Sequence, residues 1–139
     1  MYLIDTNAIS EARKGVRADT GIRKFFADAK RQRWPLFLSV ITVGELRRGV
    51  ELIRHRGDRR QAIRLETWLT TLLDNYTDNI LDIDSDIATV WGCLRVPRHE
   101  NALDKLIAAT ALVHDLTVVT RNTRHFHLPG LKTLNPFDA

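Results

Sequence analysis

The sequence begins with Met1-Tyr2-Leu3-Ile4-Asp5-Thr6-Asn7, and this stretch carries the clearest signal for the fold. Residues 1–4 form a short apolar run of the kind that buried central strands show. The run stops at Asp5, and the side chains of Thr6 and Asn7 can cap a helix that starts there. The stretch therefore predicts a buried strand that leads directly into a helix.

The same alternation of strand and helix recurs along the rest of the chain. Apolar runs predict further strands over residues 36–41, 79–83, 116–119 and 131–134. Apolar residues at helical spacing predict helices over residues 42–53, 58–73, 85–94 (capped by Asp84 or Ser85) and 103–113. Strands that alternate with helices predict a three-layer α/β/α domain around a central parallel sheet. Because no repeat or flexible linker interrupts residues 1–139, we expect a single domain.

The composition excludes several classes of protein. A chain of 139 residues can bury about two-thirds of its unfolded surface, and a hydrophobic content of 44% is too high for a disordered chain. Cys93 is the single cysteine, which excludes an internal disulfide and any zinc site that needs two thiolates. No apolar run approaches the ~18 residues that cross a bilayer, and the first residues lack the features of a signal peptide. We therefore expect a cytoplasmic protein without a membrane partner, and the net charge of +4 is compatible with an anionic partner.

Four polar side chains are expected at one edge of the sheet. Ligands of parallel sheets bind at the carboxyl ends of the strands, where Asp5 and Asn122 follow two predicted strands. Glu45 is expected in the first turn of the helix after the second strand, and Asp104 at the start of the helix over residues 103–113. Three carboxylates repel one another unless a cation neutralises them, and Mg²⁺ or Mn²⁺ prefers such oxygen ligands. An ion held there can activate water and stabilise a phosphodiester during in-line attack.

Each of these residues also has a purely structural interpretation. Thr42 and Glu45 match the spacing of a capping box, in which Glu45 only holds a backbone N–H. Asp104 can complement a helix dipole, and Asn122 alone is typical of a turn. The pair His125-x-His127 has the residue type of a metal site, but we interpret it as exposed loop histidines.

Four segments carry a resemblance to a known family. They are Leu3-Ile4-Asp5-Thr6-Asn7, Thr42-Val43-Gly44-Glu45-Leu46, Asn101-Ala102-Leu103-Asp104-Lys105-Leu106-Ile107-Ala108-Ala109-Thr110-Ala111 and Val118-Val119-Thr120-Arg121-Asn122. In this order they resemble a PIN domain, and more closely the VapC-type toxins of bacterial VapBC toxin–antitoxin pairs, including the FitB-like branch. The resemblance covers nearly the whole chain. It implies a cytoplasmic, Mg²⁺-dependent endoribonuclease that forms a homodimer and is inhibited by a cognate VapB-type antitoxin.

The resemblance also implies roles for individual residues. Asp5, Glu45 and Asp104 take the positions of the family's metal-binding catalytic acids. Around them lie three residues that would support the pocket: Thr6, which would orient Asp5, with Asn7 and Thr120.

One position departs from the pattern of the family. Where the family often has a fourth catalytic acid, this chain has Asn122, and where many relatives with Asn there have a nearby aspartate, it has His125. The amide oxygen of Asn122 can still bind a metal ion or its water, at lower charge. The departure leaves open how tightly the site binds metal, and whether it holds one ion or two.

Seven arginines crowd the region after Glu45. They are Arg47, Arg48, Arg54, Arg56, Arg59, Arg60 and Arg64. Arginine pairs with phosphate in a bidentate manner, so we assign Arg47 and Arg48 to RNA binding. The other five are expected on a solvated face, or facing the antitoxin or a second subunit.

Two other functional classes remain as alternatives. Phosphatases that form an aspartyl phosphate also place an aspartate after the first strand, but they need a second acid two residues later, where this chain has Asn7. The second alternative is a catalytically weakened PIN-fold module that binds RNA or an antitoxin, and Asn122 with His125 is the feature that favours it.

Overall fold

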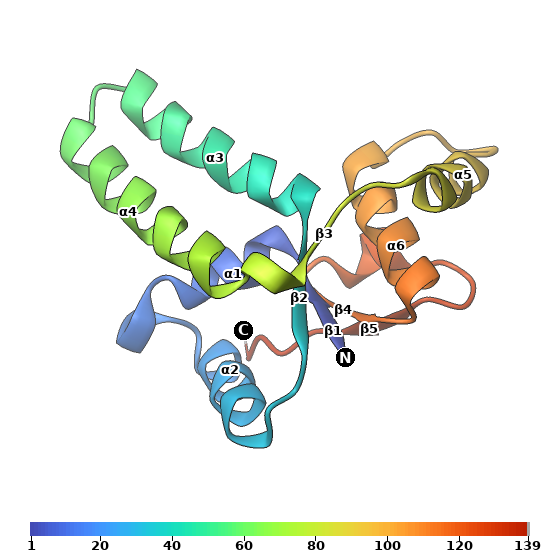
Figure 1. The fold of residues 1–139 in the computed structure, drawn as a ribbon, viewed down its shortest axis with the longest axis horizontal. Helices are drawn as coiled ribbons and strands as arrows, with labels where there is room; N and C mark the ends of the chain where they lie inside the picture. Colours follow the sequence, from blue (N-terminus) through green and yellow to red (C-terminus); the bar gives the residue numbers. More distant parts are fainter. Residues whose placement is uncertain (139) are drawn as a thin grey trace.

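The computed structural model of the protein describes residues 1–138, and a parallel sheet lies at the centre of this part of the chain (Figure 1). Its five strands are β1 (Tyr2–Ile4), β2 (Leu36–Ser39), β3 (Ile80–Leu81), β4 (Thr117–Val119) and β5 (Lys132–Leu134). Their order across the sheet is β3-β2-β1-β4-β5, and every neighbouring pair is parallel. The predicted parallel sheet is confirmed, with β1 in its middle.

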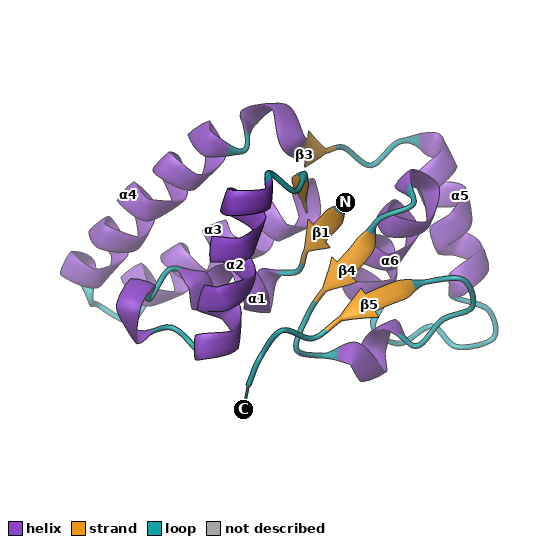
Figure 2. Cartoon of the chain, turned by 90° about the horizontal axis from the view of Figure 1, so that it is seen from below, coloured by secondary structure: helices purple, strands orange, loops and turns teal. Residues whose placement is uncertain are grey.

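Helices cover both faces of this sheet. They are α1 (Thr6–Ala12), α2 (Thr20–Gln32), α3 (Val40–His55), α4 (Arg59–Asn75), α5 (Ser85–Leu94) and α6 (Ala102–His114). Short 3-10 turns lie at Gly15–Arg17, Thr77–Asn79 and Thr123–Phe126. Figure 2 shows α1, α2, α3 and α4 on one side of the strands, and α5 and α6 on the other. The predicted three-layer α/β/α architecture is therefore confirmed.

The alternation of side chains along each strand supplies the two halves of the core. In β1, Leu3 packs in the cluster that contains α6, whereas Ile4 packs in the cluster that contains α1 to α4. In β4, Val118 and Val119 divide between the same two clusters. All four side chains are fully buried, as expected for strands with helices on both faces.

The caps of two helices, α3 and α1, differ from the prediction. The predicted strand 36–41 ends at Ser39, whose hydroxyl accepts a hydrogen bond from the Ile41 N–H at 3.1 Å and starts α3 two residues earlier. Asp5, not Thr6 or Asn7, is the N-cap of α1. Of the two residues predicted to cap α5, Asp84 is the N-cap, and its carboxylate accepts the Ile87 N–H at 2.9 Å.

The helix α2 was not predicted. Its N-cap is Asp19, whose carboxylate accepts the N–H groups of Gly21 and Ile22 at 2.9 and 3.1 Å. Its buried face is formed by Ile22, Phe25 and Ala29, which follow helical spacing. The signal for this helix was therefore present in the sequence as a cap and a periodic apolar face.

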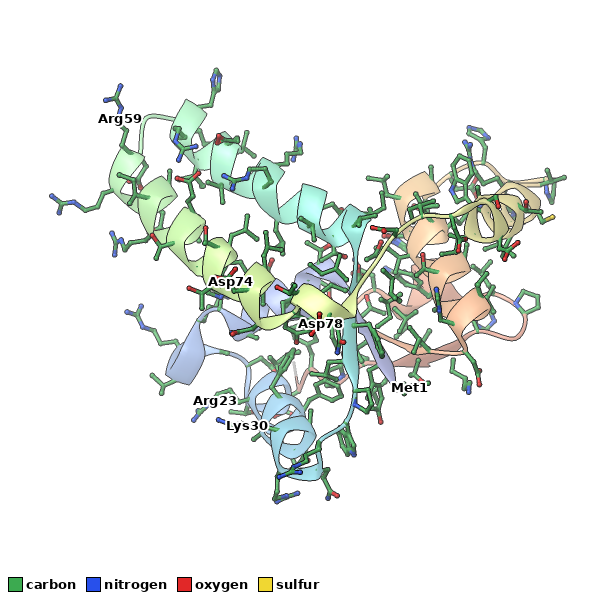
Figure 3. The ribbon with its side chains drawn as sticks, in the orientation of Figure 1. Met1, Arg23, Lys30, Arg59, Asp74 and Asp78 are labelled. Atoms are coloured by element: carbon green, nitrogen blue, oxygen red, sulfur yellow. The ribbon has the colours of Figure 1, made fainter. Side chains whose placement is uncertain are left out.

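The helices α3 and α4 form an antiparallel hairpin that extends away from the sheet (Figure 1). Arg59 lies at its far end, whereas Asp74 and Asp78 lie near the sheet (Figure 3). Both helices carry many charged side chains, and within residues 1–138 no helix has the length and apolar character needed to cross a membrane.

Candidate active site

Asp5 lies at the carboxyl end of the central strand and is held by a set of hydrogen bonds. Its carboxylate accepts the Thr120 hydroxyl at 2.8 Å, the Thr6 N–H at 2.8 Å and the Asn7 amide at 3.2 Å. The residue is only 4% exposed. Asp5 is therefore a buried acid in a fixed orientation. A polar residue in a solvated turn would instead be exposed and free to move.

Burial raises the pKa of the Asp5 carboxyl from its ordinary value of 3.8 to about 6. Loss of hydration is the largest cause, and the hydrogen bonds from Thr120 and Thr6 oppose it. The charges of Asp104 and Glu45 raise the pKa further. Asp5, directly after β1, therefore interacts electrostatically with Glu45 of α3 and with Asp104 of α6.

Glu45 lies in the second turn of α3, one turn later than predicted, because α3 starts at Val40. Its carboxylate accepts the Thr6 hydroxyl at 2.7 Å. Thr42 is fully buried, and its hydroxyl lies 3.3 Å from that of Thr6. The capping-box interpretation is therefore wrong, since Ser39 caps the helix. Thr6 touches Asp5 through its backbone N–H and Glu45 through its side chain.

Asp104 lies in the first turn of α6, where a carboxylate also complements the helix dipole. Its Oδ2 atom lies 2.7 Å from Nδ1 of His125, and the two side chains are 24% and 43% exposed. His125 is thus more than an exposed loop histidine, because it pairs with a predicted catalytic acid. No sequence pattern indicated this pair, since the two residues lie 21 positions apart in different elements.

Thr120 and Asn7 connect the end of β4 to the end of β1. The Asn7 amide donates to the Thr120 hydroxyl at 3.2 Å, and its oxygen accepts the Arg121 N–H at 3.0 Å. The Asn122 N–H donates to the same Thr120 hydroxyl at 3.0 Å. These bonds bring the predicted support residues Asn7 and Thr120 into one network with Asp5, and they fix the backbone of Asn122 beside it.

The donor chemistry of this cluster suits a hard divalent cation. Asp5, Glu45 and Asp104 offer carboxylate oxygens, and mutual repulsion between them is what such an ion relieves. Within residues 1–138, however, no three His, Cys, Asp or Glu side chains lie close enough together to hold one ion in this arrangement. Glu45 is hydrogen-bonded to Thr6 through Oε1 and Asp104 to His125 through Oδ2, so each carboxylate keeps its other oxygen for an ion or for a water that bridges to one.

Arg47 and Arg48, which the sequence analysis assigned to RNA, differ in their partners in the structure. Both side chains are exposed, but Arg47 pairs with Glu66 of α4 at 2.7 Å, so its charge is compensated, whereas Arg48 forms no ion pair with the described residues. Arg54 likewise pairs with Glu51 and Glu66. The RNA-binding role of Arg47 and Arg48 stays a prediction. Two arginines that the sequence analysis did not single out, Arg121 and Arg124, line one hollow with His125, which contacts Asp104.

This fold and this cluster of acids agree with the family comparison. The family model of the PIN domain matches residues 2–131. The chain therefore belongs to the PIN domain family.

The chain is similar to proteins named as toxins and ribonucleases. It is 33% identical to toxin FitB of Neisseria gonorrhoeae over 99% of both chains. It is also 33% identical to VapC ribonuclease Y4jK of Sinorhizobium fredii, again over 99% of both. The crystal structure of FitAcB from Neisseria gonorrhoeae superposes with a TM-score of 0.85 at 31% identity, covering 98% of both chains. The resemblance to the VapC and FitB proteins is confirmed.

Proposed function

We propose that this protein is a Mg²⁺- or Mn²⁺-dependent endoribonuclease that acts in the cytoplasm as the toxin of a toxin–antitoxin pair. The observation that carries the proposal is the buried Asp5 carboxylate at the end of β1, whose pKa is raised by burial and by the charges of Glu45 and Asp104. A divalent cation would relieve the repulsion between these acids, which supports its presence at this sheet edge. The ribonuclease name of a relative that matches over nearly its whole length supports the substrate class.

The roles of the residues follow from their positions. Asp5, Glu45 and Asp104 would hold the ion in part through bridging waters, because the three carboxylates do not converge on one point, and the ion would supply an activated water and stabilise charge on the phosphate. Thr120 holds one oxygen of Asp5 through a hydrogen bond. Asn122 is the residue at the predicted fourth position, where its amide oxygen would contribute a neutral ligand or hold a bound water.

A cleavage assay tests this proposal. Wild type is incubated with a mixed RNA pool in Mg²⁺, in Mn²⁺ and in EDTA, beside Asp5→Asn and the exposed control Asp78→Asn. We expect cleavage by wild type and Asp78→Asn in either metal, none in EDTA, and none by Asp5→Asn. Absence of any metal-dependent cleavage would instead support the catalytically weakened RNA- or antitoxin-binding module.

A groove beside Glu45 supports the second half of the proposal, an antitoxin partner. A cavity of about 280 Å³ lies between α1, α3 and α4. Its apolar wall is formed by Leu46, Val50, Leu52, Ile53, Leu65 and Trp68. Thr6 and Glu45 line the end of the groove at the candidate active site. An amphipathic segment bound there could place a cationic side chain beside the acids and neutralise them in place of the metal.

The predicted homodimer is part of the same proposal. The candidate antitoxin is the product of a small gene adjacent to the one that encodes this protein. Sedimentation velocity of the purified protein, alone and with that product, measures its oligomeric state directly. We expect a dimer of about twice 15.9 kDa for the isolated chain. A monomer at micromolar concentration would show that this part of the resemblance does not hold.

A further inference from the structure

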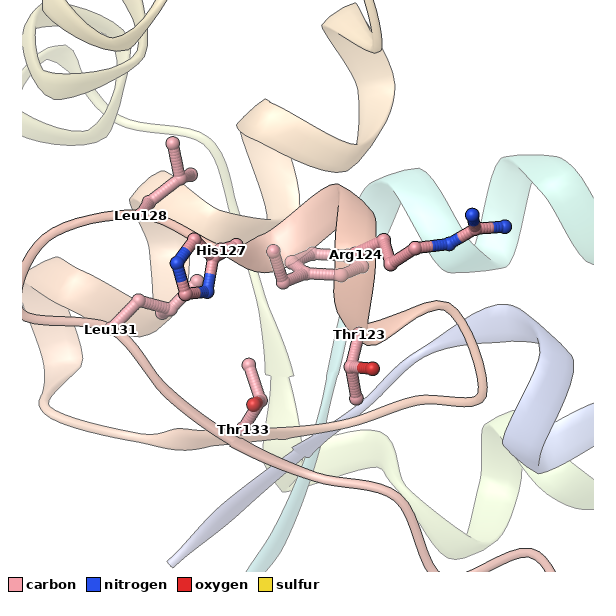
Figure 4. A pocket seen from close by; sticks show the side chains of 7 residues that line it. Thr123, Arg124, His127, Leu128, Leu131 and Thr133 are labelled. Carbon is pink, nitrogen blue, oxygen red and sulfur yellow. The ribbon is translucent and has the colours of Figure 1, made fainter.

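The connection between β4 and β5 carries two hollows that the acid cluster does not use. The smaller measures about 250 Å³ and is lined by Arg121, Asn122, Thr123, Arg124 and His125. The larger measures about 490 Å³ and is shown in Figure 4. Its lining residues are Thr123, Arg124, Phe126, His127, Leu128, Leu131 and Thr133. Thr123 and Arg124 line both hollows, so the two adjoin.

The smaller hollow is directly connected to the candidate catalytic acids. His125, on one wall, contacts Asp104 at 2.7 Å. Asn122, on another wall, donates its N–H to the Thr120 hydroxyl, which in turn donates to Asp5. A group bound in this hollow would therefore lie next to the site where an RNA backbone is cut.

The two arginines of the smaller hollow have no carboxylate partner. Within residues 1–138, neither Arg121 nor Arg124 forms an ion pair within 4.0 Å, in contrast to Arg47 and Arg54. The charge of Arg121 lowers the pKa of Glu11 from a distance, but Glu11 is already bonded to Lys14 and to a backbone N–H. Two uncompensated guanidinium groups beside an RNA-cutting site are suited to phosphate.

Arg121 is also held in place before any ligand binds. Its guanidinium carbon lies 4.0 Å from the centre of the Phe137 ring, and its backbone N–H donates to Asn7. A cation that is already stacked loses less side-chain entropy when it binds an anion.

The larger hollow has the size and mixed polarity that suit a nucleobase. Its volume falls in the range of small-ligand pockets. Leu128 and Leu131 offer apolar surface, while His127 and the threonines offer hydrogen-bonding groups for a base edge. In Figure 4 the Arg124 side chain extends away from His127 and Leu131, so its guanidinium is directed outside this hollow.

We propose that the β4–β5 connection is a nucleotide subsite for the RNA substrate. Arg121 and Arg124 bind the backbone phosphate adjacent to the cleaved bond, and the larger hollow takes the base of that nucleotide. This inference rests on the proposed ribonuclease function and assigns its RNA-binding surface to a part of the chain other than Arg47 and Arg48. RNA fits this surface better than an antitoxin segment does, because the lining is cationic and polar, whereas the apolar groove lies between α1, α3 and α4.

The test is the salt dependence of RNA binding. A fluorescein-labelled 12-nucleotide RNA is titrated with wild-type protein in EDTA, which prevents metal-dependent cleavage, at several salt concentrations between 50 and 200 mM. For single strands, each phosphate contact contributes about 0.7 to the slope of log K against log salt. We expect Arg121→Gln and Arg124→Gln each to make this negative slope shallower by about 0.7. Each should also weaken binding about fivefold or more at low salt.

Matched variants make the result specific. Arg59→Gln, at the far end of the α3–α4 hairpin, should leave the slope unchanged. Arg121→Lys should restore the slope although it loses the planar stack on Phe137. His127→Ala should keep the slope but reduce the difference in affinity between oligo(A) and oligo(U). Circular dichroism and thermal melting verify that each variant is folded.

The outcomes separate this proposal from the proposed function. If wild type cleaves RNA in Mg²⁺ or Mn²⁺ while Arg121→Gln and Arg124→Gln leave the slope unchanged, the subsite is overturned and the ribonuclease stands. If the slope instead becomes shallower only in Arg47→Gln or Arg48→Gln, the RNA backbone binds along α3 and the subsite is overturned. If the slope falls as expected but no metal-dependent cleavage occurs, the subsite stands and the enzyme does not. If wild type binds no RNA, the subsite is overturned whatever the cleavage assay gives.

Discussion

At the scale of single residues, Asp5 combines two functions that usually compete. As the N-cap of α1 it accepts a backbone N–H, and as a buried acid it receives the Thr120 hydroxyl. Those hydrogen bonds favour the charged form, but they do not fully offset the loss of hydration, so the pKa stays near 6. The folded protein therefore holds a carboxylate at neutral pH at a cost in stability.

The first prediction concerns this cost. Below pH 4, Asp5 is protonated in both the folded and the unfolded chain, and no stability is lost. As the pH rises through about 6, the unfolded chain releases its proton more readily, so the metal-free protein loses up to about 3 kcal/mol. Asp5→Asn cannot ionise and should lack this loss, so its stability relative to wild type should increase between pH 4 and pH 7. Urea unfolding at a series of pH values measures the difference.

The comparison with Asp5→Asn isolates one group. Asp28 and Glu66 have lowered pKa values because of Lys24 and Arg47, and they stabilise the fold as the pH rises. These contributions are shared by both proteins and cancel. Asp74→Asn, on an exposed position of α4, serves as the control. Parallel pH profiles for wild type and Asp5→Asn would show that Asp5 ionises normally.

Metal binding to wild type at pH 7 should recover part of the loss in stability, because the metal stabilises the folded state alone.

A second prediction concerns Asn122, whose backbone the Thr120 hydroxyl holds near Asp5. Asn122→Asp adds one negative charge near the proposed ion, which is worth on the order of 1–4 kcal/mol at surface-like dielectric. We expect calorimetric titration to show Mg²⁺ or Mn²⁺ binding tightened by about tenfold or more. Asn75→Asp, exposed at the end of α4, adds the same charge and should leave the affinity unchanged. Equal affinities in all three proteins would place Asn122 outside the field of the metal.

At the scale of elements, short strands position the acids because the sheet is parallel. β1 and β4 pair in register from Tyr2 with Thr117 to Ile4 with Val119, so Asp5 and Thr120 leave the sheet side by side. α3 and α6 then bring Glu45 and Asp104 to the same edge. A few residues of strand suffice, because burial on both faces and pairing on both sides fix the register.

The contact between α2 and the C-terminal segment gives a third prediction. A Cβ atom at Gly21 would lie 1.9 Å from the Pro136 carbonyl oxygen, so no other residue fits without movement. Gly21→Ala should therefore destabilise the protein by about 1–3 kcal/mol, as overpacking does. Gly92→Ala, in α5 where nothing lies within 4 Å, should instead stabilise by up to about 1 kcal/mol. Chemical denaturation measures both, and equal effects would contradict the close approach.

At the scale of the whole molecule, the α3–α4 hairpin carries two kinds of surface. Its inner side forms the apolar groove that ends at Glu45. Its far end carries Arg59 and other exposed cations (Figure 3). The β4–β5 connection, with its own free arginines, lies apart from this groove. Under the proposed function, an antitoxin segment and RNA would therefore bind different surfaces, and each surface reaches the acids.

The fourth prediction tests the groove in the intact complex. The protein is co-expressed with the product of the adjacent gene and purified through a tag on that product. Ile53→Asp puts a charge on the groove wall and should abolish co-purification. Ile63→Asp makes the same change at a side chain that is 60% exposed outside the groove, and should have no effect. Co-purification of both variants would show that the partner binds elsewhere.

The sequence by itself determined the alternation of strands and helices and the positions of the acids within them. Apolar runs that end at Asp5 and near Asn122 reflect a local requirement, since a buried strand is apolar and polar residues follow where it reaches the sheet edge. The helices were predicted on an equally local basis, because a helix that packs against a sheet repeats its apolar residues at helical spacing. The helix α2 was missed although its cap and apolar face are equally local.

Only the tertiary structure decided which polar group each acid meets. Thr6 bonds to Glu45 across 39 positions, Thr120 to Asp5 across 115, and Asp104 to His125 across 21. The pairing of Arg47 with Glu66 likewise depends on how α3 packs against α4. A hydrogen bond or ion pair forms only within about 3–4 Å, and that distance is set by strand order and helix packing rather than by spacing along the chain. Sequence patterns therefore located the acids, whereas the fold alone decided their partners, their burial and the raised pKa of Asp5.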